Sequence, residues 1–217
     1  MAGMTPSRIL VLAAGIAAPV LFVIGQALLP NLGREVDPAF VLMLQHRDQL
    51  ILSRLLTTAG AYLLLATLWL IARQGGRTTR VGACIAAVGT FFNAVSQAVQ
   101  GYAAWGATAP GLDHPVTMQT LLHLEDGAAG FVVSYWSVPV FGVGLVVMSV
   151  GLLVRRSTPW WMPALLVLGV VSAFLTAGLG PVVAVTQAPL AAALIALALR
   201  SGITLASPLP AVHAERK

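Results

Sequence analysis

Hydrophobic residues in this chain are gathered into six long runs, and the short segments between the runs hold most of the charged residues. Each run is about 20 residues long, the length that an α-helix needs to cross the hydrocarbon core of a bilayer. The runs predict helices over residues 9–30, 50–72, 81–105, 128–154, 159–178 and 181–199. The strands of a membrane barrel would instead alternate over about ten residues. The pattern therefore predicts an all-α, polytopic membrane bundle of six transmembrane helices, forming a single integral membrane domain over residues 1–217.

The composition agrees with a membrane location and argues against a soluble or nucleic-acid-binding protein. Of the 217 residues, 58% are hydrophobic and 9% are charged, whereas soluble domains are about a quarter charged. The net charge of +5 comes from basic residues in short segments between the runs rather than on one basic face. We therefore predict no nucleic-acid partner. Cys84 is the one cysteine, so no disulfide is expected within the chain.

The connections between the runs alternate in charge along the chain. Because cytoplasmic loops of membrane proteins are enriched in Lys and Arg, the basic connections are predicted to be cytoplasmic. Both termini are then cytoplasmic (N-in, C-in) in a multi-pass protein of the cell membrane, with a short cytoplasmic tail over 201–217. Nine of the twelve basic residues fall on this side, namely Arg8, Arg73, Arg77, Arg80, Arg155, Arg156, Arg200, Arg216 and Lys217.

The two longer external connections resemble each other. One reads DPAFVLMLQHRD over residues 37–48, and the other reads DHPVTMQTLLHLED over residues 113–126. In each, a proline closely follows an acid, and a histidine comes eight residues after the proline. Proline fits the first turn of a helix, and aspartate caps its free amides. We therefore predict a short interfacial helix in each external connection.

Polar residues inside the predicted spans are concentrated in the outer halves. Asn93, Gln97 and Gln100 are spaced four and three residues apart and therefore share one helix face. Arg54 lies about one turn inside the second predicted span, and Tyr135 lies at the outer end of the fourth. Such groups are costly in hydrocarbon, so these five are predicted to bind a ligand in a cavity open to the outside. The alternative is that polar side chains bond across packed helices and only hold them together.

A cluster of ionisable residues precedes the fourth run. His123 and Asp126 are three residues apart and share a helix face, and Glu125 lies between them. These residues are the candidate catalytic groups, as an acid–base pair at the mouth of the cavity with Arg54 beneath them. The alternative is a solvated helix start. No phosphate loop, paired-cysteine motif or zincin pattern is visible, so we assign no metal and no cofactor. The alternative is that a bundle brings His46, His123 and Asp126 together as metal ligands.

Three functions fit these features. The first is a small multi-pass membrane protein that binds a lipid-like or amphiphilic small molecule in a polar pocket in the outer half of the bundle. The second is a membrane-embedded enzyme that uses the His, acid and Arg cluster at the external face. The third is an accessory subunit of a larger complex. Membrane lipid is the expected partner in each case, and the Gly- and Ala-rich spans are also compatible with a homo- or hetero-oligomer.

Overall fold

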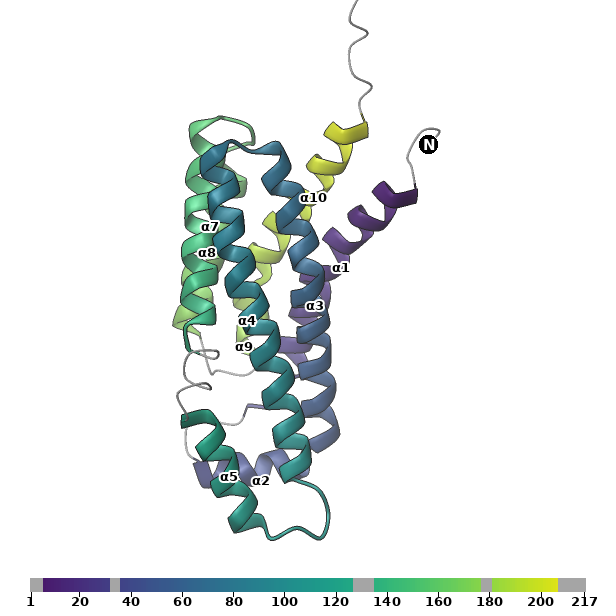
Figure 1. Cartoon of the computed structure of the whole chain (residues 1–217), viewed down its shortest axis with the longest axis vertical. Coiled ribbons are helices and arrows are strands. Elements are labelled where there is room, and N and C mark those ends of the chain that lie inside the picture. Colours follow the sequence, from purple (N-terminus) through teal and green to yellow (C-terminus); the bar gives the residue numbers. More distant parts are fainter. Residues whose placement is uncertain (1–5, 32–35, 127–134, 177–180, 207–217) are drawn as a thin grey trace, which may run out of the picture.

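A computed structural model describes residues 6–31, 36–126, 135–176 and 181–206. These residues form helices joined by short turns, with no strand among them (Figure 1). The all-α prediction is therefore confirmed for the part of the chain that is described. The helices are α1 (Pro6–Leu28), α2 (Val36–Gln45), α3 (Arg47–Gln74), α4 (Arg77–Ala107), α5 (His114–Asp126), α7 (Ser137–Val154), α8 (Trp161–Leu175), α9 (Val182–Thr186) and α10 (Ala188–Ala206).

Three of these helices are long and apolar enough to cross a membrane. They are Arg47–Arg73, Arg77–Ala107 and Ser137–Val154. Three further apolar helices are shorter, at Leu12–Leu28, Trp161–Leu175 and Ala188–Arg200. The described residues thus contain fewer candidate spans than the six predicted. The first, fifth and sixth predicted spans are the ones that fall short, because their apolar helices are the three shorter ones, below the length of about 20 residues that crosses a bilayer.

The sixth predicted span is divided into two helices. Helix α9 ends at Thr186 and α10 begins at Ala188, with Gln187 between them. Pro189 explains the division, because proline has no amide hydrogen and its ring clashes with the carbonyl group four residues earlier. The hydroxyl group of Ser172 donates a 2.6 Å hydrogen bond to the carbonyl oxygen of Thr186 at this break. Helix α10 then continues to Ala206, past the predicted end at residue 199.

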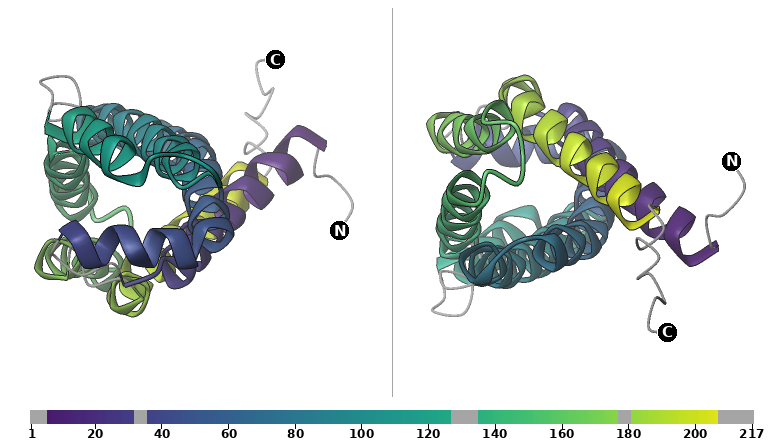
Figure 2. Two further views of the ribbon diagram at one scale, coloured as in Figure 1. Left: turned by 90° about the horizontal axis from the view of Figure 1, so that it is seen from below. Right: turned by 90° about the horizontal axis from the view of Figure 1, so that it is seen from above.

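Six helices form a closed ring. Helix α3 packs against α4, α4 against α7, α7 against α8, α8 against α10, α10 against α1, and α1 against α3. Seen along the long axis, these helices surround a common centre (Figure 2). The short helices α2 and α5 lie at one end of the ring, and the α3–α4 and α7–α8 connections lie at the other (Figure 1). The predicted short helices in the two longer connections are therefore present. At the opposite end, Arg73 lies in the last turn of α3, Arg77 begins α4, and Arg155 directly follows α7.

Glycines bring neighbouring helices into close contact. A methyl group added at Gly82 of α4 would lie 2.3 Å from the backbone nitrogen of Met148 in α7. One added at Gly25 of α1 would lie 2.8 Å from the backbone nitrogen of Thr57 in α3. Small residues of this kind let helices approach closely in membranes, where packing replaces the hydrophobic effect between helices.

The outer surface of the ring is apolar. Exposed side chains of α4 include Val88, Phe91, Phe92 and Val99, and the other ring helices expose similar residues. Extended apolar surface is rare on soluble monomers and marks contact with lipid or a partner. Together with the three long apolar helices, this surface indicates a membrane protein.

Candidate functional site

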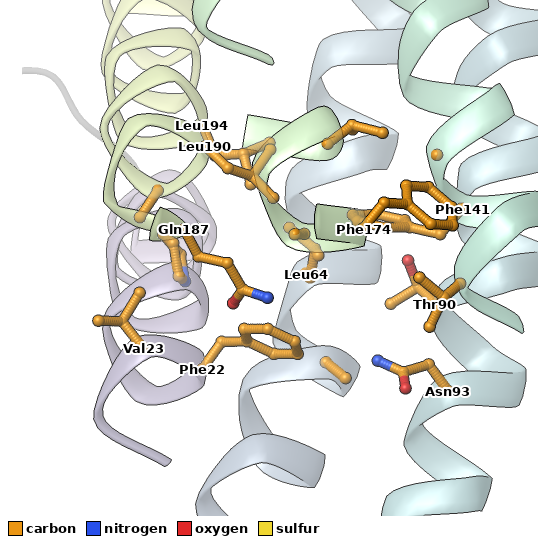
Figure 3. A pocket seen from close by; sticks show the side chains of 17 residues that line it. Phe22, Val23, Leu64, Thr90, Asn93, Phe141, Phe174, Gln187, Leu190 and Leu194 are labelled. Carbon is orange, nitrogen blue, oxygen red and sulfur yellow. The ribbon is translucent and has the colours of Figure 1, made fainter. Parts of the chain in front are cut away.

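A cavity of about 80 Å³ lies at the centre of the ring. All six ring helices contribute to its wall, which is mostly apolar (Figure 3). Phe22, Phe141 and Phe174 supply three phenyl rings from α1, α7 and α8. The polar side chains in the wall are Thr90 and Asn93 of α4 and Gln187 between α9 and α10. Sites for small molecules have this composition, with an apolar lining and a few polar groups that fix orientation.

Gln187 is the most unusual residue of the wall. Its side chain is only 9% exposed, and its Oε1 atom has no hydrogen-bond partner in the part of the chain that the structure describes. Figure 3 shows its amide directed into the cavity beside Phe22 and Leu64. The break that Pro189 imposes places it there. A buried polar atom without a partner carries a desolvation penalty of about 1–3 kcal/mol.

A row of polar side chains runs along α4 from the cavity toward the α2 and α5 end. Asn93 lines the cavity, and its Oδ1 accepts a 3.3 Å hydrogen bond from Nε2 of Gln97 one turn further on. Oε1 of Gln97 in turn accepts a hydrogen bond from Nη1 of Arg54 in α3. Gly101 makes room for this arginine, since a methyl group there would lie 2.7 Å from the Cβ atom of Arg54. The row therefore connects α3 and α4 next to the cavity.

The structure brings together three of the five predicted ligand-binding residues. Arg54, Asn93 and Gln97 form one hydrogen-bonded row, but only Asn93 lines the cavity. Gln100 is partly buried and lies outside the lining, and Tyr135 is 65% exposed and also outside it. The cavity thus differs from the polar pocket that the sequence predicted, because apolar side chains make most of its wall.

The candidate catalytic residues lie on α5. This helix continues to Asp126, so the three-residue spacing of His123 and Asp126 does place them on one helix face. The imidazole ring of His123 is exposed, with Nδ1 2.8 Å from the carbonyl oxygen of Gln119 in its own helix. The structure describes the backbone of Glu125 and Asp126 but not their side chains. The predicted contact of these carboxyl groups with Arg54 therefore lies outside what is described. Among the described residues, no group of three or more His, Cys, Asp or Glu gathers to hold a metal ion.

Sequence reasoning did not select Gln187 or the phenyl rings of the cavity as site residues. The signal for Gln187 was local, since it is an amide in an apolar run two residues before Pro189. Polar side chains often accompany such a break, because the freed backbone groups need partners. The phenyl rings gave no local signal, because they come from separate helices.

Known proteins give no guide to this site. No family model matches the chain, and neither a comparison with curated proteins nor one with solved structures gave a match.

Proposed function

We propose that this protein is a six-span protein of the cell membrane, with both termini in the cytoplasm, whose central cavity binds a lipid-like or amphiphilic small molecule. The observation that carries the proposal is the cavity itself, which has an apolar wall with Thr90, Asn93 and Gln187 as its polar groups. An amphiphile matches both parts of this wall. Its apolar body would contact the phenyl rings, and its polar group would contact an amide.

The shorter ring helices are compatible with six spans. Helix α1 has 23 residues and is about 34 Å long at 1.5 Å per residue, which exceeds the bilayer core. Helix α8 has 15 residues and is about 22 Å long, a mismatch that a bilayer accommodates by local thinning. Helices α9 and α10 together cover the sixth span.

The orientation is supported by where the arginines gather. The α3–α4 and α7–α8 connections lie at the same end of the ring (Figure 1). Arg73 and Arg77 flank the first of them, and Arg155 and Arg156 begin the second. A basic end of this kind faces the cytoplasm in most membrane proteins. The cavity and the polar row of α4 then lie toward the external end, where α2 and α5 would rest at the membrane interface.

Native mass spectrometry of the protein released from mild detergent tests the proposal. Ala191 lines the cavity, whereas its neighbour Ala192 is exposed on the outer surface of α10. We expect a small-molecule adduct on the wild-type protein and on Ala192→Phe, but not on Ala191→Phe, whose ring would fill the cavity. Equal adducts on both variants would show that the bound molecule is surface lipid, and the proposed cavity function would be wrong.

A further inference from the structure

Among the residues that the structure describes, no charged side chain lines the wall of the cavity. Its polar groups are the hydroxyl group of Thr90 and the amides of Asn93 and Gln187, and all its other lining residues are apolar or glycine. The nearest charge along the polar row, on Arg54, is already bonded to Gln97 and lies outside the lining. An ionised ligand would therefore have to leave water for an apolar wall without a counterion in that wall, which is strongly unfavourable.

The amide of Gln187 defines where a polar group of the ligand would lie. Its Oε1 atom is buried and has no partner among the described residues, so a donor on the ligand would remove the penalty of that atom. Asn93 enters the cavity from the opposite wall, and Figure 3 shows the two amides directed toward the space between them. A hydroxyl group both donates and accepts a hydrogen bond, so it matches an amide in either orientation.

The size of the cavity limits the apolar body of the ligand. A protein cavity of roughly 150 Å³ holds one benzene molecule, and this cavity measures about 80 Å³. One ring is therefore the upper limit, and small shifts of Phe22 and Phe174 would be needed to admit it.

We propose that the cavity ligand is an uncharged alcohol with a compact apolar body, and that its hydroxyl group hydrogen-bonds to the side-chain amide of Gln187. This inference rests on the proposed function, because it specifies the chemistry of the amphiphile that the cavity takes.

Three fluorinated probes of nearly equal shape test the inference by fluorine NMR with the full-length protein in lipid nanodiscs. They are para-fluorotoluene, para-fluorobenzyl alcohol and para-fluorobenzoate, and each affinity is corrected for partition of the probe into lipid. In the wild type we expect the alcohol to bind about tenfold more tightly than the toluene, from one added hydrogen bond to a buried group. The benzoate is expected to bind most weakly.

The variant Gln187→Leu is the matched comparison, because leucine has a similar volume and leaves no polar atom without a partner. We expect this variant to bind the toluene at least as well as the wild type and to lose the preference for the alcohol. An alcohol preference that is missing in the wild type, or that persists in Gln187→Leu, would overturn the inference. Tightest binding of the benzoate would also overturn it, since the ligand would then be an anion.

Failure of the proposed function would give a different result. In that case each of the three probes would either not bind or bind equally well to the cavity-filling variant Ala191→Phe. Binding that Ala191→Phe removes, but that is equal for the toluene and the alcohol, would overturn only the assignment of the hydroxyl group to Gln187.

Discussion

Replacing Gly82 at the contact between α4 and α7 is predicted to destabilise the protein, and the direction of the effect follows from the distances across that contact. A methyl group added at Gly82 would lie 2.3 Å from the backbone nitrogen of Met148, 2.7 Å from its Cα and 2.8 Å from the carbonyl oxygen of Gly144. Atoms in favourable contact lie about 3.5–4.0 Å apart, so the two helices must separate by about 1 Å. All three neighbours are backbone atoms, which a change of side-chain rotamer does not relieve.

Two opposing terms set the size of the effect in Gly82→Ala. Overpacking of a close contact costs about 1–3 kcal/mol, and a backbone neighbour favours the upper end of that range. Replacing glycine by alanine inside a helix contributes about 0.5–1 kcal/mol of stability in the opposite direction. We expect Gly82→Ala to lower the free energy of unfolding by about 2 kcal/mol, taking the upper part of the overpacking range less the helical gain.

Gly106 provides the matched control in the same helix. A methyl group there would have no heavy atom of another described helix within 4 Å, so only the helical term applies, and we expect Gly106→Ala to stabilise by up to about 0.5–1 kcal/mol. Reversible unfolding in mixed micelles of increasing SDS content, followed by circular dichroism, measures both variants. If Gly82→Ala proves as stable as Gly106→Ala, the close packing of α4 on α7 is refuted.

Three further predictions concern the polar row, the orientation and the outer surface. Arg54→Met keeps the aliphatic part of the side chain but removes the donor to Gln97, so we expect a loss of about 1–3 kcal/mol in the same unfolding assay; unchanged stability would mean that this hydrogen bond is unimportant. A reporter fused after Gly111 should be external and one fused after Gly76 cytoplasmic, and the reverse result would invert the orientation. Cys84 is exposed on the apolar surface of α4, so in a membrane its thiol would face lipid. A water-soluble maleimide should therefore fail to label it in intact vesicles, because the reagent stays in water and reacts with the thiolate; rapid labelling would contradict burial in lipid.

Local sequence patterns predicted the elements well where each helix has its own signal. Helices α3 and α4 extend only a few residues beyond the predicted 50–72 and 81–105. The short helices α2 and α5 follow from an acid and a proline at the start of each segment. The division at Gln187 was missed because the apolar run continues on both sides of Pro189, although the proline that causes the break is visible in the sequence.

The candidate site was predictable only within single helices. The spacing of Asn93 and Gln97 predicted that they share a helix face, and on that face their side chains are hydrogen-bonded. The bond from Arg54 to Gln97 depends on how α3 is positioned along α4, which is set by packing at Gly101. The cavity depends on six helices at once, so no periodicity along the chain indicates its position or its apolar wall.

Photolabelling in lipid vesicles tests the central claim most directly, namely that the ring of helices encloses a binding cavity within the membrane. The probe is a short alcohol that carries an alkyl diazirine, and labelled residues are identified by peptide mass spectrometry. We predict saturable labelling of Phe22, Phe141 and Leu190, which line the cavity, with competition by unlabelled alcohol and loss in Ala191→Phe. Labelling confined to outward side chains such as Val88, with no saturation, would contradict the account.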